Sequence, residues 1–261
     1  MVQLNLSFNK FLKDIILNDF NIKKYYNKKF PNTKYTLDSI IEGILYVLKT
    51  GIAWRDFIHH SIKWNSLFFH FNRFVQYDIF KKTYIKLKSS YLKTNKDDLF
   101  IIDSSFILNK YGKNKLARNK FYKGKFGNKI SLITDSNGIP ISILINKGNV
   151  HDLSFIEKHS KDLFIINKNK QHILLADKAY TSKDVRTNLS LFNCSIMVPN
   201  KKGTKNKLEF DKNIYKKRII IEHTFQKLKI FRRINIRYDS YIKTYLSFLL
   251  LASSKIIFDK L

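Results

Sequence analysis

Cysteine is almost missing from this sequence: Cys194 is the single one among 261 residues. A lone cysteine cannot form a disulfide within the chain, so a disulfide-stapled framework is excluded. It lies in the apolar stretch 194–198, where we expect it to pack as a small core residue. A reducing compartment is compatible with this usage but is not required by it.

Long hydrophobic runs are also missing, since no segment reaches the roughly 20 apolar residues of a membrane span. The nearest candidate, residues 245–258, is interrupted by three serines and a lysine. No basic region leads into an apolar one at the N-terminus, so no secretory signal is expected. We expect a soluble intracellular protein without a membrane partner. It would be cytoplasmic or nucleoid-associated in a bacterium, and would need nuclear access in a eukaryotic or viral setting.

Acidic residues are the third scarcity. The chain has 20 Asp and Glu against 49 Lys and Arg, a formal net charge of +29. Self-repulsion on this scale is usually tolerated because the partner is a polyanion. A lysine-rich solvated surface from an AT-rich genome is the alternative, but it does not account for so few acids. Nucleic acid is therefore the favoured partner.

What is present indicates a globular protein, with 44% hydrophobic and 26% charged residues. The periodicity divides the chain near residue 95. Before it, apolar residues at three-to-four spacing predict helices over 37–49, 62–75 and 79–92, the first capped by Thr36 and ended by Gly51. This pattern fits a helix-turn-helix-like DNA-binding region over residues 1–95, or a plain helical bundle, and the sequence leaves both open.

Residues 96–261 alternate short apolar strands with helices, which predicts a mixed α/β domain. The strands are expected at 99–103, 128–134, 139–146, 173–176 and 195–198. The helices are expected at 153–166, 183–191 and 214–230 and near the C-terminus. The sequence Asp-Ser-Asn-Gly at 135–138 predicts a hairpin turn between the second and third strands.

Two of the scarce acids, Asp103 and Asp177, are each expected to close a short apolar strand. Ligands of open α/β sheets lie at strand ends. Adjacent carboxylates raise each other's pKa, a cost that a divalent cation removes. The alternative is two unrelated acids exposed to solvent, and strand position alone does not separate the two interpretations.

A third acid, Glu222, lies in the predicted helix 214–230. Tyr215 precedes it by seven residues, Arg218 by four, and Lys229 follows it by seven. At about 3.6 residues per turn, these side chains project from one helix face. Ordinary pairing of Arg218 with Glu222 would explain one pair but not the whole arrangement.

These residues resemble a known signature. The spacing Tyr215-x2-Arg218-x3-Glu222-x6-Lys229 is similar to the Y-(2)-R-(3)-E-(6)-K pattern of DDE insertion-sequence transposases with an IS-four-like catalytic domain. Other blocks agree: Ile-Asp-Ser-Ser at 102–105, Gly-Asn-Val-His-Asp at 148–152, Ala-Asp-Lys-Ala-Tyr at 176–180 and the N-terminal region 43–55. Ala179 replaces the family's usual glycine and leaves the acids intact.

The resemblance implies a ribonuclease-H-like mixed sheet flanked by helices, and a DDE catalytic domain over residues 96–261. It implies that Asp103, Asp177 and Glu222 are both catalytic and metal-binding, holding two Mg²⁺ or Mn²⁺ ions per active site. The implied function is DNA transposition, in which element ends are cut and their 3′-hydroxyls are joined to target DNA. Synapsis of two ends favours a homodimer.

The expected DNA contacts lie in three groups. Arg218, Lys229 and Tyr215 would contact DNA beside the acids, and Trp54 and Arg55 would do so in the N-terminal region. Lys123, Lys125 and Lys129 belong to the stretch 110–129, which has eight Lys or Arg and no acid. Its aromatic residues, Phe121 and Phe126 among them, would either stack on unpaired bases or pack the sheet.

Two rival functions remain. A transposase relic that only binds DNA would lose one of the three acids readily by drift, and all three are intact. A nuclease or resolvase with the same fold would cut DNA without joining it. Strand-transfer activity separates the second rival from a transposase.

Overall fold

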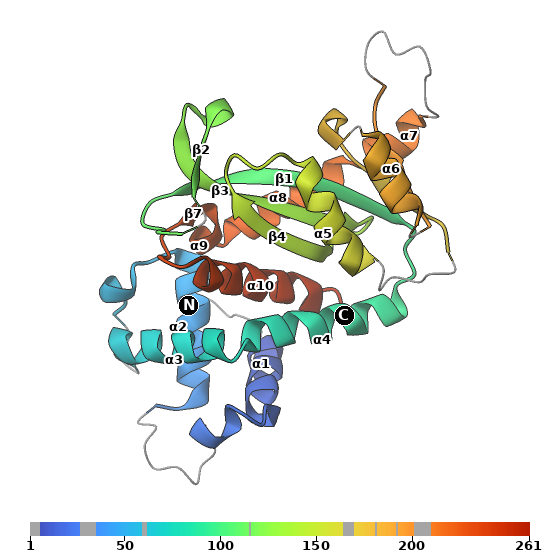
Figure 1. Cartoon of the computed structure of the whole chain (residues 1–261). Helices are drawn as coiled ribbons and strands as arrows, with labels where there is room; N and C mark the ends of the chain where they lie inside the picture. Colours follow the sequence, from blue (N-terminus) through green and yellow to red (C-terminus); the bar gives the residue numbers. More distant parts are fainter. Residues whose placement is uncertain are drawn as a thin grey trace. The chain divides into compact units, whose positions relative to one another are not determined.

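The computed structural model describes residues 6–26, 35–58, 62–114, 116–163, 170–180, 182–191, 193–200 and 210–261 (Figure 1). The chain divides into two compact units, Met1–Ser90 with Leu228–Leu261, and Tyr91–Lys227. Residues 228–261 thus group with the N-terminal helices, whereas the sequence assigned them to the second domain. The functional division near residue 95 stays a prediction.

The first unit is helical. Its elements are α1 (Leu6–Asn18), α2 (Leu37–Thr50), α3 (Trp64–Gln76), most of α4 (Ile79–Thr94), α9 (Arg232–Asn235) and α10 (Ile242–Phe258), with short 3-10 turns η1 (Lys23–Tyr25) and η2 (Trp54–Asp56). The hydroxyl of Thr36 accepts the N–H of Ser39 at 3.2 Å and caps α2. Gly51 ends that helix with a φ of 69°. Both predicted boundaries of α2 are confirmed.

Aromatic rings fill the core of this unit. Phe71 of α3 stacks on Phe248 of α10 with ring centroids 4.4 Å apart. Trp54 packs against the same pair, 5.1 Å from Phe71 and 6.0 Å from Phe248. Phe71 and Phe74 of α3 are therefore core residues, whereas Trp64, Phe68 and Phe69 of the same helix remain exposed. Whether this region reads a DNA groove stays a prediction.

The second unit is built on a mixed sheet. Its strands are β1 (Leu99–Asn109), β2 (Ala117–Asn119), β3 (Lys125–Asp135), β4 (Pro140–Lys147), β5 (His172–Leu175) and β6 (Cys194–Met197). The order runs β2-β3-β1-β5-β6, and β4 also pairs with β3. β1 is antiparallel to β3 and parallel to β5, and β5 is parallel to β6. This is the expected ribonuclease-H-like mixed layout, with the predicted hairpin turn between β3 and β4.

Helices occur between and after the later strands. They are α5 (Leu153–Leu163), α6 (Lys183–Ser190), α7 (Lys212–Lys216) and α8 (Ile219–Ile230), and 3-10 turns occur at η3 (Lys120–Tyr122) and η4 (Lys178–Tyr180). α5 packs on β4, and α6 packs on β6 (Figure 1). The polar stretch 201–209 lies outside the described residues.

Two predicted boundaries were wrong. β1 continues to Asn109, so Asp103 lies inside the strand and not at its end. The extension follows from the ladder with β3, which is continuous from Phe100–Asp135 to Leu108–Gly127 and satisfies the backbone beneath Ser104 and Ser105. The predicted strand ended at Asp103 because polar residues follow the apolar run there, but the backbone pairing continues past them.

The predicted single helix 214–230 is two helices, α7 and α8. The N–H groups of Lys217 and Arg218 bond to carbonyls three residues back, which tightens the chain between them. Three consecutive isoleucines follow, from Ile219 to Ile221, and β-branched side chains are weak helix formers.

Among the described residues, no helix combines the length and apolar character needed to cross a bilayer.

Candidate active site

The register of β1 and β5 brings two acids to the same place. Ile101 pairs with Leu175, the last residue of β5. Asp103 and Asp177 each come two residues after a member of this pair, so both continue from it in the same direction. Burial raises the pKa of Asp103, and the nearby charge of Asp177 adds to that rise, as expected for two carboxylates close together. Asp103 thus lies inside β1 but beside the end of β5, the strand end that ligands favour.

Arg218 joins the third acid to the first. Its Nη1 donates to Oδ2 of Asp103 at 2.9 Å, and its Nη2 donates to Oε1 of Glu222 at 2.7 Å. Asp103 and Arg218 are 115 residues apart in the sequence. The fork of a guanidinium suits two carboxylates at once. The i,i+4 pair of Arg218 with Glu222 is therefore present, and the same guanidinium also pairs with Asp103, so that it bridges the two acids.

Burial and charge act in opposite directions at this cluster. Burial is the main reason that the pKa of Asp103 is raised, and the charge of Asp177 acts in the same direction. The hydrogen bond from the N–H of Ser104 and the charge of Arg218 both act to lower it. Burial works against the charge of Arg218, but Asp103, Tyr215 and Glu222 outweigh it and raise the Arg218 pKa. The guanidinium therefore compensates acids that would otherwise be costly to keep together.

Tyr215 lies within the field of all three acids. Burial is the main reason that its pKa is raised, and Asp177, Asp103 and Glu222 each add to the effect. Its ring lies 5.0 Å from that of Phe210. The phenol is therefore held beside the carboxylates while remaining partly exposed.

The hairpin turn holds α8 in position. The hydroxyl of Thr224 donates to the carbonyl of Gly138 at 2.9 Å. Gly138 has a φ of 75°, and a Cβ there would lie 2.8 Å from the Thr224 hydroxyl. Ile221 and Phe225 bury the same side of the helix. Glu222, one residue from this packed face, is consequently fixed near the sheet.

A second polar group, centred on Asp152, lies beside Asp103. The hydroxyl of Ser104 donates to Asp152 at 2.5 Å, and the ammonium of Lys129 lies 3.1 Å from the same Asp152 oxygen. Tyr180 is buried beside them, with a pKa raised by burial and by Asp152 and Asp103. The similarity of 148–152 and 176–180 to family blocks was the signal available in the sequence.

The acids fit a divalent cation by chemistry, because all three supply the carboxylate oxygens that Mg²⁺ and Mn²⁺ prefer. Their present spacing differs from that of a bound site. Within the described ranges, no group of three or more His, Cys, Asp or Glu side chains is arranged to hold a metal ion. Arg218 lies between Asp103 and Glu222 and supplies the positive charge.

The expected DNA contacts have different surroundings. Lys123, Lys125 and Arg55 are exposed to solvent. Lys129 is 14% exposed and paired with Asp152, whereas Trp54 packs among aromatic rings.

Lys229 is half-buried in α8, and burial lowers its pKa. Lys229 and Glu222 both lie in α8, and the DNA contact expected of Lys229 stays a prediction.

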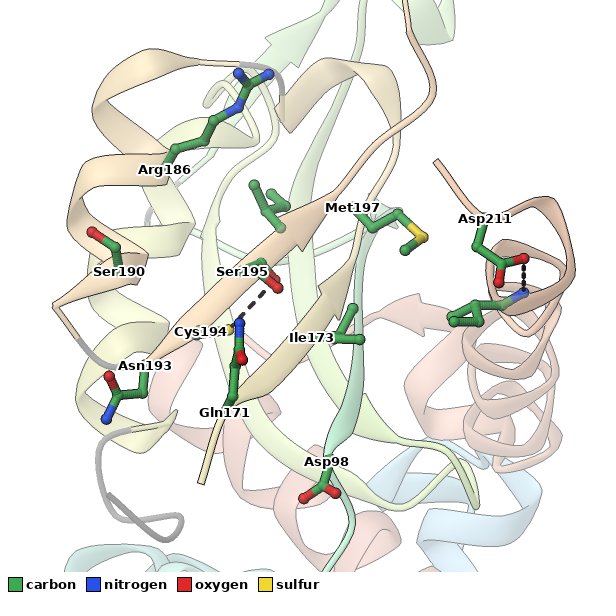
Figure 2. Close-up of a pocket in the computed structure, with 12 residues that line it drawn as sticks. Asp98, Gln171, Ile173, Arg186, Ser190, Asn193, Cys194, Ser195, Met197 and Asp211 are labelled. Carbon is green, nitrogen blue, oxygen red and sulfur yellow. Dashed lines mark hydrogen bonds between the residues drawn. The ribbon is translucent and has the colours of Figure 1, made fainter. Parts of the chain in front are cut away.

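The second unit also has a pocket of about 940 Å³, which lies along β6 and the start of β1 (Figure 2). Its lining includes Asp98, Ser195, Met197 and Asp211, but none of the three acids. This pocket is therefore separate from the acidic site, which is defined by the convergence of charged side chains.

The chain belongs to the family described as the transposase DDE domain, which matches residues 94–254. This range contains all three acids. A curated relative, a putative transposase for insertion sequence element IS402 from Burkholderia cepacia, is 26% identical over 146 residues. The alignment covers 54% of this chain and 65% of the relative, so the chain spans just under two thirds of that protein's length.

Solved transposase structures are also similar. The piggyBac transposase synaptic complex with hairpin DNA aligns with a TM-score of 0.44 at 12% identity, covering 62% of this chain and 47% of that chain. The catalytic domain of Mos1 mariner transposase aligns with a TM-score of 0.31 at 12% identity, covering 67% of this chain and 92% of that chain. The family assignment rests on the sequence match over residues 94–254.

Proposed function

We propose that this protein is a DNA transposase that cuts element ends and transfers their 3′-hydroxyl strands into target DNA. The observation that carries the proposal is the bridge from Arg218 to Asp103 and Glu222, beside Asp177. It joins two of the three acids of the family signature and adjoins the third. Membership of the DDE transposase family supports the same function.

Asp103, Asp177 and Glu222 would hold two Mg²⁺ or Mn²⁺ ions through their carboxylate oxygens. When bound, such ions would supply Lewis acidity and positive charge at a phosphodiester. The role of the acids is to fix the position of that charge, which is the main requirement of phosphoryl transfer. Arg218 holds one oxygen of Asp103 and one of Glu222, so releasing them would free both carboxylates to turn to a common ligand.

The released guanidinium can turn to a phosphate, since it binds phosphate with the same planar fork as carboxylate. Lys229 supplies a second cation, and Tyr215 can donate its hydroxyl near the cleaved nucleotide. Lys123, Lys125 and Arg55 extend the basic surface that would bind element ends and target DNA. Lys129 would act mainly by holding Asp152, given their ion pair. Synapsis of two ends favours a homodimer.

The test is Mg²⁺-dependent nicking and strand transfer on the ends of the element that encodes the protein. Wild type should cut and join these ends, and Asp177→Asn should do neither while binding DNA normally. Asp184→Asn is the matched control, because Asp184 is an exposed acid at the start of α6 and should leave both activities unchanged.

Each rival predicts a different result. A DNA-binding relic would bind the ends without cutting them. A nuclease or resolvase of the same fold would cut but leave no joined product. Either outcome with wild-type protein would overturn the transposase proposal.

A further inference from the structure

The hairpin tip, residues 117–127, carries an aromatic side chain with almost no protein contact. Phe121 is 96% exposed. A single exposed ring is not by itself a binding site, but it would bury apolar area if a partner covered it, so its meaning depends on the residues around it. The hairpin between β2 and β3 extends from the body of the sheet (Figure 1).

The backbone of the hairpin tip is fixed by one buried residue. The side-chain oxygen of Asn119 accepts the N–H of Phe121 at 2.9 Å, and its amide donates to the carbonyl of Gly148 at 2.7 Å. The N–H of Gly124 closes the turn on the carbonyl of Asn119 at 3.0 Å. Lys123 and Gly124 have φ values of 54° and 68° that reverse the chain.

The neighbouring ring anchors the tip to the sheet. Tyr122 stacks on Phe106 of β1, with centroids 4.3 Å apart and planes 19° from parallel. Phe106 in turn covers Gly127, where a Cβ would come within 2.3 Å of its ring. Tyr122 therefore has one face covered by Phe106 and stays 48% exposed, while Phe121, the preceding residue, is almost fully exposed.

Charge selects the partner. No acid occurs between Asp103 and Asp135, and the hairpin tip has four cations: Arg118, Lys120, Lys123 and Lys125. None of the four forms an ion pair with a described residue, and Arg118 covers Phe126 at 4.9 Å instead. An uncompensated basic rim around an exposed aromatic ring is complementary to nucleic acid, whose phosphates meet the cations and whose bases meet the ring.

We propose that Phe121 stacks on unpaired or unstacked DNA bases, with the hairpin tip acting as a wedge on distorted DNA. This inference rests on the proposed function in taking DNA as the partner, and it adds the state of the DNA that is bound. The distance from the acids to the hairpin tip can be compared with DNA. Leu108, which pairs with Gly127 at the base of the tip, lies five residues beyond Asp103 on β1. Five strand residues span about 17 Å, which equals about five nucleotide steps along DNA.

The test compares full-length protein on two DNA probes in EDTA, a 30-base-pair duplex and the same duplex with four central mismatches. Wild type should bind the mismatched probe about tenfold more tightly in fluorescence anisotropy, as expected for stacking on exposed bases. Phe121→Ala should lose this preference and keep its affinity for paired DNA within about twofold, because the lysines remain. Phe121→Trp should retain the preference.

Phe20→Ala is the matched control, since Phe20 is 79% exposed in the other unit. It should preserve both affinities. The inference is overturned if wild type binds both probes equally, or if Phe121→Ala keeps the preference. It is also overturned if sedimentation shows that Phe121→Ala abolishes self-association and leaves DNA discrimination unchanged, which would make a second copy the partner. Failure of wild type to bind either probe would instead overturn DNA as the partner in the proposed function.

Discussion

Two arginine–carboxylate clusters in this protein have similar hydrogen bonds but very different exposure. In the helical unit, Arg233 donates to Asp239 at 2.9 Å, and their side chains are 3% and 2% exposed. In the sheet unit, Arg218 donates to Asp103 at 2.9 Å, and these side chains are 24% and 25% exposed. Both pairs link charged groups at hydrogen-bond distance, so bond length does not distinguish them.

The surroundings of the two arginine–carboxylate clusters distinguish them. Arg233 also donates to the carbonyl of Ile52, and the rings of Trp54 and Phe248 lie 5.7 and 5.4 Å from its guanidinium. Removing one member would leave a buried charge without its counter-ion. Water reaches Arg218 and its carboxylates, so another cation can replace the guanidinium there. Enclosure makes the first cluster structural, and access makes the second suitable for ligand exchange.

The largest expected effect is on activity at the accessible cluster. Asp103→Asn keeps the size of the side chain and removes its charge. Single-turnover nicking should fall by on the order of 10³-fold or more, about 4 kcal/mol of transition-state stabilisation. Urea unfolding should change by less than about 1 kcal/mol, since Asp103 is a half-buried acid with a raised pKa. A variant that unfolds much more easily would make this cluster structural too.

The enclosed cluster should show the opposite behaviour. Asp239→Ala should lower the free energy of unfolding by about 3–5 kcal/mol, because Arg233 would remain buried and unpaired. Asp259→Ala is the control: it removes the exposed pair of Asp259 with Lys255 and should cost no more than about 1 kcal/mol. Equal losses in the two variants would remove burial as the distinguishing factor.

Burial in the helical unit also predicts a pH dependence. Burial, with Arg73 adding to it, lowers the pKa of His70 to about 4, and its Nδ1 lies 2.7 Å from the hydroxyl of Tyr26. The unfolded chain therefore binds a proton more readily than the folded one. Stability from this group is full above about pH 6.5 and is lost as pH falls toward 4, by at most about 3 kcal/mol.

Thermal unfolding of wild type and His70→Gln across this range checks the sign. The variant should be less stable at neutral pH and should depend less on pH between 6.5 and 4. An unchanged slope would show that another group carries the proton linkage.

The smallest expected effect on stability is at Arg218. Arg218→Gln removes a partly exposed bridge and should change the free energy of unfolding by about 1 kcal/mol or less. Without DNA, it should tighten Mn²⁺ binding by about tenfold in calorimetry, because the guanidinium no longer competes for Asp103 and Glu222. Lys217→Gln, the exposed neighbour, is the control and should leave the affinity unchanged. Weaker Mn²⁺ binding by the Arg218 variant would show that the bridge assembles the acids instead of competing for them.

Local chemistry made several features predictable. Thr36 and Gly51 define α2 because a cap and a left-handed residue act on their own helix. The turn at 135–138 is likewise encoded by its own residues. The three acids were selected by spacing and by similarity to a family signature, and their roles stay proposals.

Other features depend on distant partners. The strand containing Asp103 continues through Ser104 and Ser105 to Asn109 because β3 pairs with it along almost its whole length. The bridge from Arg218 to Asp103 joins residues 115 positions apart, whereas the sequence pattern offered only the neighbour Glu222.

The sequence by itself determined the cap and end of α2, the hairpin turn, the mixed α/β class and the basic charge, because these depend on composition or on residues near one another in the chain. The candidate acids came from a spacing pattern and a family resemblance. Tertiary structure decided whether a charged pair is enclosed or open, and whether an aromatic side chain packs or projects. Phe121 and Tyr122 are adjacent in the chain, yet their surroundings differ. Phe106 stacks on Tyr122, whereas Asn119 bonds to the backbone of Phe121 and the ring of Phe121 remains exposed. Exposure depends on which distant residues surround a side chain, and only the folded chain fixes that.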